Sequence, residues 1–227
     1  SYLKQLERKG IKSLYLDDIG GKRPTQSAAL PGQEREAPTA VISTNDKLAK
    51  VEASVRACVE CPLHETRTQA VFGVGNPRTQ VVFIGEAPGR DEDIKGEPFV
   101  GRAGQLLTKI FAAIDLKRED VYITNILKCR PPANRDPQES EVRRCENYLI
   151  SQIDIIKPKL ICALGRVAAQ WLLQTDAPLG AMRTGEYYYR DIRVLVTYHP
   201  AALLRNPNFK RPAWEDFKKM KAMLDDM

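Results

Sequence analysis

Four cysteines have a spacing that is typical of metal sites. Cys58 and Cys61 form a Cys-x-x-Cys pair, while Cys129 and Cys145 stand singly further along the chain. Four thiolates of this kind hold either Zn²⁺ or an iron–sulfur cluster. Zinc sites more often pair two Cys-x-x-Cys knuckles, so the two isolated cysteines favour a cubane cluster. Zinc, or four cysteines without any metal, stay open as alternatives at this point.

The fifth cysteine, Cys162, lies in a short apolar run at 159–165 that is typical of a buried strand. A thiol in such a place behaves as a small hydrophobe, so we expect Cys162 to be structural. An odd number of cysteines, with no visible secretory signal, argues against a disulfide framework.

A second group of residues follows the ends of predicted strands. Gly85 and Gly89 lack a Cβ, so the loop that they bound can approach a ligand closely. Phe99 follows a proline just ahead of a helix, where an aromatic ring suits stacking on a planar ligand. Asn125 offers an amide acceptor and two donors at one strand end, and His199 stands at another. The ordinary alternatives are a strand-to-helix turn for the loop and a turn former for Asn125.

The elements that must position these residues alternate along the chain. Helices are predicted at 46–57, 103–116, 137–156, 166–173 and 212–224, strands at 80–85, 120–125 and 159–164, and a hairpin of strands at 187–189 and 193–197. This alternation predicts an α/β layered fold with a mostly parallel sheet. Ligand-binding loops should then follow the carboxyl ends of the strands.

Length and composition indicate one ordinary globular domain with a tail: 227 residues, of which 43% are hydrophobic and 28% charged. Residues 20–45 are rich in glycine, proline and polar residues, as linkers are. We therefore expect an N-terminal extension and linker at 1–45 and the main domain at 46–227. No apolar run approaches the roughly 20 residues of a membrane span. The net charge of +6 permits a polyanionic partner without requiring one.

Six elements, in order, match a known family. They are Cys58-x-x-Cys61, Gly85–Gly89 with Glu92 and Asp93, Pro98–Gly101, Thr124–Asn125 continuing through 128–132, Cys145, and His199–Leu203. Together they resemble the family 4 uracil-DNA glycosylases, the iron–sulfur branch of that superfamily, over residues 48–224. The resemblance implies a three-layer α/β/α sandwich with a central, mostly parallel sheet. It also implies a structural 4Fe–4S cluster held by Cys58, Cys61, Cys129 and Cys145.

The resemblance further implies base flipping, because a uracil inside the stack cannot be reached. The flipped uracil would contact the loop at Gly85 and Ala87 and stack on Phe99. Asn125 would read it, since one amide complements both O4 and N3–H. His199 would donate a hydrogen bond to O2 as the base leaves as an anion.

Two parts of the chemistry depart from the better-known family 1 enzymes. Those enzymes carry an aspartate where this chain has Ala87, and a tyrosine that blocks thymine where it has Gly89. We expect Glu86 to anchor the loop and Glu92 to hold the catalytic water or shape the pocket. Some side chain other than residue 89 must exclude the 5-methyl group of thymine.

Two residues after the last strand are expected to contact DNA. Leu203 stands where superfamily members push an apolar wedge into the duplex, although a core leucine is the alternative. Arg205 could neutralise a phosphate.

These interpretations lead to one expected function and two competing ones. We expect a monofunctional, monomeric and intracellular (cytoplasmic, nucleoid-associated) glycosylase that releases uracil from single- or double-stranded DNA, with a possible protein partner for residues 1–45. A uracil-DNA binding protein that traps DNA through a histidine on an inserted loop is disfavoured, because residues 101–107 contain neither insertion nor histidine. A zinc-stapled nucleic-acid binder is disfavoured by the pair Asn125 and His199.

Overall fold

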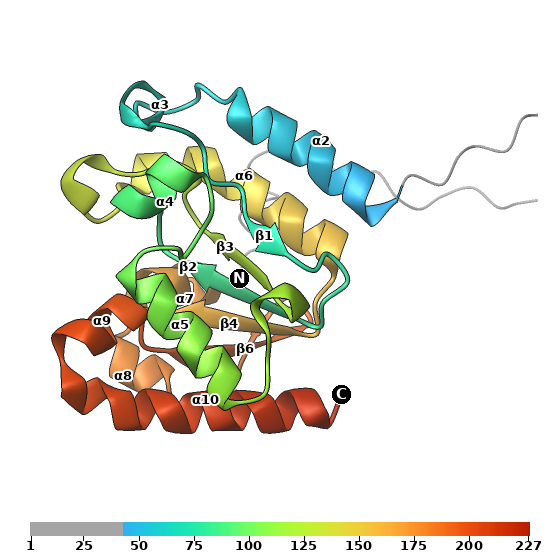
Figure 1. The fold of residues 1–227 in the computed structure, drawn as a ribbon, viewed down its shortest axis with the longest axis vertical. Coiled ribbons are helices and arrows are strands. Elements are labelled where there is room, and N and C mark those ends of the chain that lie inside the picture. Colours follow the sequence, from blue (N-terminus) through green and yellow to red (C-terminus); the bar gives the residue numbers. More distant parts are fainter. Residues whose placement is uncertain (1–42) are drawn as a thin grey trace, which may run out of the picture. The chain divides into compact units, whose positions relative to one another are not determined.

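The computed structural model describes residues 43–227, whose centre is a six-stranded sheet in the order β1-β3-β2-β4-β6-β5 (Figure 1). The strands are β1 (Val74–Gly75), β2 (Val81–Gly85), β3 (Tyr122–Asn125), β4 (Leu160–Leu164), β5 (Tyr187–Tyr189) and β6 (Ile192–Thr197). Strands β3, β2, β4 and β6 run parallel, and β1 and β5 pair antiparallel at the two edges. This confirms the predicted α/β fold with a mostly parallel sheet.

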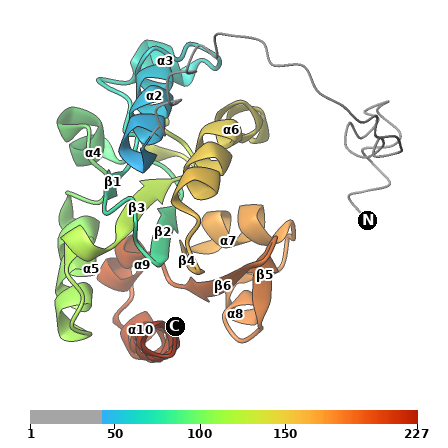
Figure 2. The same ribbon diagram turned by 90° about the vertical axis from the view of Figure 1, so that its right-hand side faces the viewer.

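Helices cover both faces of the sheet, so the fold has three layers (Figure 2). They are α2 (Thr44–Arg56), α3 (Leu63–Thr66), α4 (Arg90–Lys95), α5 (Arg102–Ala113), α6 (Glu139–Ile156), α7 (Arg166–Leu173), α8 (Leu179–Met182), α9 (Pro200–Arg205) and α10 (Lys210–Asp225), with short 3₁₀ helices η1 (Arg118–Asp120), η2 (Pro132–Asn134) and η3 (Pro207–Phe209). Apolar residues of α2, α6 and α7 pack on one face, and those of α5 and α10 pack on the other.

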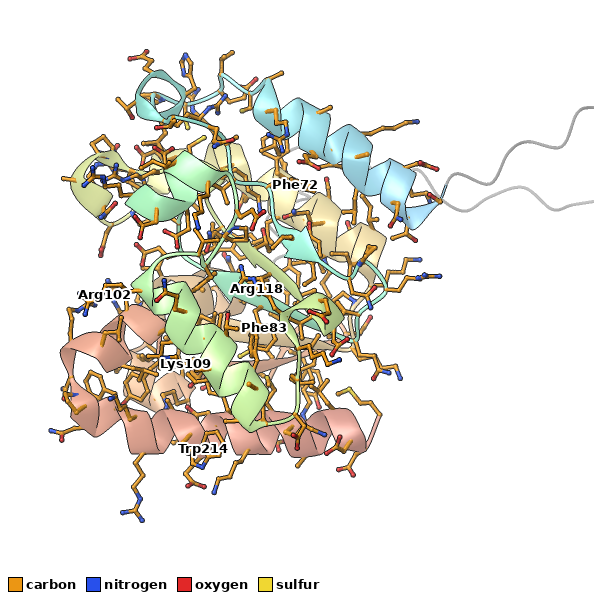
Figure 3. The ribbon with its side chains drawn as sticks, in the orientation of Figure 1. Phe72, Phe83, Arg102, Lys109, Arg118 and Trp214 are labelled. Carbon is orange, nitrogen blue, oxygen red and sulfur yellow. The ribbon has the colours of Figure 1, made fainter. Side chains whose placement is uncertain are left out.

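Strand β2 shows why the sheet is buried on both faces. Val82 and Ile84 join the core beneath α2, α6 and α7, whereas Val81 and Phe83 join the core beneath α5 and α10. The Phe83 ring lies 4.6 Å from that of Phe111 on α5. Figure 3 labels Phe83 next to this helix. A parallel strand covered by helices on both sides must be apolar at every position, and β2 is buried throughout.

The helix boundaries differ from the predicted ones for identifiable reasons. Helix α4 was not among the predicted helices; it follows the loop bounded by Gly85 and Gly89, and it ends at Gly96, whose φ of 75° suits a helix C-cap. Helix α10 begins at Lys210, before Pro212, because proline is tolerated in a first turn. Helix α2 begins at Thr44, where Ser43 and Asp46 form a capping box. The N-terminal extension and linker expected at 1–45 lie largely outside the described residues.

No helix within residues 43–227 is long and apolar enough to cross a membrane.

Candidate active site

The carboxyl ends of four parallel strands open into a cavity of about 480 Å³, here called the strand-end pocket. Gly85 ends β2 and pairs in register with Asn125, which ends β3. Gly165 follows β4, and His199 follows β6 by two residues. The sheet therefore brings together residues that are far apart in sequence, at the edge where α/β folds bind ligands. A cavity of this size can hold a nucleotide-sized ligand.

Asn125 presents an unpaired acceptor in the strand-end pocket. Only 2% of its surface is exposed, and its Oδ1 is buried without a hydrogen-bond partner among the described residues. Leaving such an atom unpaired costs about 1–3 kcal/mol, so it needs an explanation. A Cβ at Gly85 would lie 2.4 Å from this oxygen and 2.6 Å from Phe99 Cζ. Position 85 must therefore be glycine for the amide and the ring to close over the strand end.

Phe99 is held in a strained conformation beside that amide. Its φ is 54°, and its ring lies 5.4 Å from the His199 ring. Its neighbours Val100 and Gly101 donate their N–H groups to Glu92 Oε1 at 2.9 and 2.8 Å. Arg118 donates to the carbonyl oxygen of Pro98 on the other side. A residue at positive φ costs about 1–3 kcal/mol and persists only where its surroundings fix it, as they do here.

The second oxygen of Glu92 fills the space beside Gly89. A Cβ at Gly89 would lie 2.8 Å from Glu92 Oε2. Because Oε1 already accepts two backbone hydrogen bonds, Glu92 is fixed as a wall of the pocket. The Glu92 side chain therefore occupies the space that a side chain at position 89 would otherwise fill.

Glu86 is a carboxyl group of the strand-end pocket whose pKa is raised toward neutral pH. Burial, with a smaller contribution from Asp136, raises the pKa of Glu86 to about 6, although Arg166 and Arg205 oppose that rise. All four residues line the strand-end pocket. Ala87, the next residue, presents only a methyl group there.

His199 is fixed in one tautomer by the start of α9. Its Nδ1 accepts a hydrogen bond from the backbone N–H of Ala201 at 3.1 Å, so the neutral ring carries its proton on Nε2. Burial, with a smaller contribution from Arg205, lowers the pKa of His199 to about 4. A neutral donor at Nε2 is therefore available at physiological pH.

One sequence-based expectation is corrected at α9. Leu203 is only 2% exposed and belongs to the interior, whereas Leu204 is 42% exposed. Consecutive helical residues point about 100° apart, so both cannot face the solvent equally. A wedge must be accessible to DNA, and Leu203 is not. Arg205, at the end of the same helix, lines the strand-end pocket, and its contact with a phosphate stays a prediction.

Sequence reasoning missed three charged residues of this pocket: Arg135, Asp136 and Arg166. Arg166 donates to Asp136 at 2.9 Å, and Arg135 makes a two-pronged pair with Glu141 at 2.9 and 2.6 Å. Arg135 and Asp136 lie in an irregular connection without periodicity. Only its basic, proline-rich composition could have indicated that it lines a site.

A second, smaller pocket is lined by Cys58, Cys61, Cys129 and Cys145, and it is here called the cysteine pocket. Arg67 Nη1 donates to Cys129 Sγ at 3.0 Å, and the backbone N–H of Lys128 donates to Cys145 Sγ at 3.3 Å. Burial raises the pKa of the Cys145 thiol to about 12. A thiolate at this position therefore needs a positively charged group, such as a metal centre.

Within residues 43–227, no three Cys, His, Asp or Glu side chains converge closely enough to hold a single metal ion. The four cysteines line one common pocket, and thiolates are ligands for zinc and for iron–sulfur clusters alike. Cys162 lies apart from them, fully buried on β4 as expected for a structural residue.

Comparisons with known proteins agree with this geometry. Residues 72–218 match the uracil DNA glycosylase superfamily. A type-4 uracil-DNA glycosylase of Archaeoglobus fulgidus is 46% identical over 77% of this chain and 92% of its own length. One of Thermotoga maritima is 41% identical over 80% of this chain and 97% of its own length. A type-5 uracil-DNA glycosylase of Pyrobaculum aerophilum is 32% identical over 57% of this chain.

The fold and the strand-end pocket thus define a member of the uracil DNA glycosylase superfamily. Within it, the chain belongs to the type-4 uracil-DNA glycosylases.

Proposed function

We infer that the protein excises uracil from DNA by hydrolysing the N-glycosidic bond, as a DNA-repair enzyme. The relatives named type-4 uracil-DNA glycosylases support this reaction. The single structural observation that carries the inference is the buried, unpaired Oδ1 of Asn125 between Gly85 and Phe99. That oxygen can accept a hydrogen bond from a bound ligand, and uracil N3–H is a suitable donor.

The residue roles follow from this pairing. The flipped uracil stacks on Phe99, gives its N3–H to Asn125 Oδ1 and accepts at O4 from Asn125 Nδ2. Cytosine has an acceptor at N3 and a donor at C4, so it would leave both amide groups mismatched. Glu92, beside Gly89, is the side chain that we propose to exclude the 5-methyl group of thymine.

His199 acts on the leaving group. As the C1′–N1 bond breaks, the electron pair moves into the base and charge builds on uracil O2. The Nε2–H of a neutral His199 donates to that oxygen, and Nδ1 stays occupied by Ala201. A donor already aimed at the developing charge typically contributes several kcal/mol of barrier lowering.

Glu86 is the group that we propose to act on the sugar side. Above its pKa of about 6 it is a carboxylate, which can stabilise the positive charge that develops at C1′ and orient the attacking water. Water then adds at C1′ and loses one proton, and one proton neutralises the uracil anion, so that an abasic site and free uracil remain. Arg166 and Arg205 keep this carboxylate from being fully neutralised by its burial.

DNA contact is assigned to the end of α9. Leu204, 42% exposed, is the residue that we propose to enter the duplex in place of the flipped base. Arg205, at the C-terminal end of α9, lines the strand-end pocket, and we propose that its guanidinium contacts a DNA phosphate.

We propose that the cysteine pocket holds a 4Fe–4S cluster on Cys58, Cys61, Cys129 and Cys145. The cluster would supply a covalent cross-link between the end of α2, the segment after β3 and helix α6. Arg67 and the Lys128 backbone already donate hydrogen bonds to two of the sulfur atoms, which stabilises thiolates.

A uracil-containing single-stranded oligonucleotide tests the function directly. Incubation with the protein, followed by alkali, should cleave the strand at the uracil and release free uracil in equal amount. A thymine-containing strand of the same sequence is the control and should stay intact. A stable covalent protein–DNA adduct in place of free uracil would instead favour the binding-protein alternative.

A further inference from the structure

Lys128 is a buried lysine that lines the cysteine pocket, and its Nζ contacts the carbonyl oxygen of Asn125, a residue of the strand-end pocket. Only 1% of its surface is exposed. Its Nζ lies within hydrogen-bond distance of three oxygens: Thr124 Oγ1 at 2.7 Å, the Asn125 carbonyl at 2.7 Å and Gln152 Oε1 at 2.6 Å. None of these oxygens belongs to a carboxylate. The hydrogen bonds of Lys128 Nζ thus all go to neutral groups of the protein, which they hold in place.

The acceptors are themselves fixed by further hydrogen bonds. Gln152, on α6, donates from Nε2 to the Phe72 carbonyl at 2.9 Å and to the Tyr122 hydroxyl at 3.0 Å. The Thr124 hydroxyl donates to the same Phe72 carbonyl at 2.9 Å. Side chains of this network therefore have few alternative arrangements, since a buried donor or acceptor without a partner is costly.

The network ends at the residue that reads the base. The Asn125 carbonyl accepts from Lys128, whereas its Oδ1 faces the strand-end pocket unpaired. Backbone hydrogen bonds from Ile126 to Gly85 and from Leu127 to Glu86 continue the pairing beyond β3. The side chain of Lys128 folds back over this turn, and its Nζ holds the main chain of Asn125 by a hydrogen bond to the carbonyl oxygen.

We propose that Lys128 is a positioning residue for uracil recognition: its ammonium group fixes the main chain of Asn125 so that the side-chain amide points at the base. This inference rests on the proposed role of Asn125. The competing interpretation is that the network only supports the cysteine pocket, since the Lys128 backbone also contacts Cys145 Sγ.

The test is a double-mutant cycle on single-turnover uracil release. Lys128→Met keeps the length of the side chain and the backbone N–H to Cys145 but removes all three donors. A displacement of a reading group by about 1 Å can slow a reaction about 100-fold, and we expect a loss of that order. In an Asn125→Ala background, the same change should slow release by less than about threefold, because no amide remains to be aimed.

Two measurements separate positioning from general support. Iron content and visible absorbance per chain should stay at the wild-type level in Lys128→Met. Tyr122→Phe is the matched control, because it removes one hydrogen bond of the network without touching Lys128 or Asn125, and it should leave the release rate within about threefold of wild type.

Thr124→Val provides a second variant in case Lys128→Met does not fold. It removes one of the three acceptors, and we expect a loss of about tenfold that also vanishes in the Asn125→Ala background. The proposal would be overturned if the rate losses of the single variants multiplied in the double mutants with Asn125→Ala. It would also be overturned if Lys128→Met lost iron to the same extent as it lost activity. If Asn125→Ala alone has no effect, the proposed reading of uracil fails first, independently of Lys128.

Discussion

The strand-end pocket and the cysteine pocket lie at the two ends of the segment 125–129, yet they are built in opposite ways. In the strand-end pocket, two polar groups lack a hydrogen-bond partner within residues 43–227: Asn125 Oδ1 and the Nε2–H of His199. In the cysteine pocket, protein donors already reach the sulfur atoms of Cys129 and Cys145.

This difference indicates what each region does. Unpaired groups cost stability and are retained where a ligand will complete them. A site in which protein donors already reach two of the four ligand atoms suits a permanent occupant. Substitutions in the cysteine pocket should therefore affect folding, and those in the strand-end pocket should affect rate alone.

The largest effect is expected in the cysteine pocket. Cys129→Ser should lose iron and most of the soluble folded protein, because a serine oxygen is a poor ligand for iron–sulfur clusters. Cys162→Ser, the matched change at a buried cysteine outside the pocket, should keep its iron. Iron content and thermal unfolding of the purified proteins measure this. Full activity of a colourless, zinc-loaded protein would end the cluster proposal.

His199→Ala should leave folding intact and slow the chemical step. Removal of one pre-aimed donor costs about 10²–10³ in rate, and DNA affinity should change little because the interaction develops as the base leaves. Single-turnover release and a binding isotherm on an uncleavable analogue check the two parts. A large loss of affinity at an unchanged rate would contradict the role on the leaving group.

The pH dependence should come from Glu86. Its pKa of about 6 means that the carboxylate form predominates above pH 6, so kcat/KM should fall about tenfold per pH unit below it. His199 titrates near pH 4 and should add nothing above that. Glu86→Gln should be slow with a flat profile between about pH 5 and about pH 8. A wild-type-like slope in that variant would assign the titration elsewhere.

The smallest effect separates the two leucines of α9. Leu204→Ala should reduce excision from duplex DNA about tenfold and leave single-stranded DNA unaffected, because only a duplex needs a wedge. Leu203→Ala should lower the free energy of unfolding by about 2–5 kcal/mol, as a core truncation does. If Leu203→Ala slowed excision from duplex DNA and Leu204→Ala lowered the stability instead, Leu203 would be the wedge.

The layered fold and most of the strand-end pocket could be predicted from the sequence. Apolar runs indicate buried strands, and in an α/β protein the polar residues that follow them lie at the edge of the sheet where ligands bind. The phase of α9 could not be predicted. Leu203 and Leu204 are adjacent and chemically equal, and the start of the helix at Pro200 decides which one faces the core.

Other features depended on distant contacts. Arg135 and Asp136 lie in an irregular connection, and the positive φ of Phe99 follows from the two backbone N–H groups that Glu92 accepts. Neither has a local signature in the chain.

The central claim is that Asn125 Oδ1 accepts the N3–H of uracil, and a substrate analogue tests it without altering the fold. Single-turnover release should be compared for DNA carrying uracil and DNA carrying N3-methyluracil, which lacks that donor. Wild type should release the methylated base at least about 100-fold more slowly, the scale of a lost buried hydrogen bond with its partner left unpaired. In Asn125→Ala the two bases should differ by less than about threefold, because the acceptor is gone. Equal release of both bases by wild type would contradict the account.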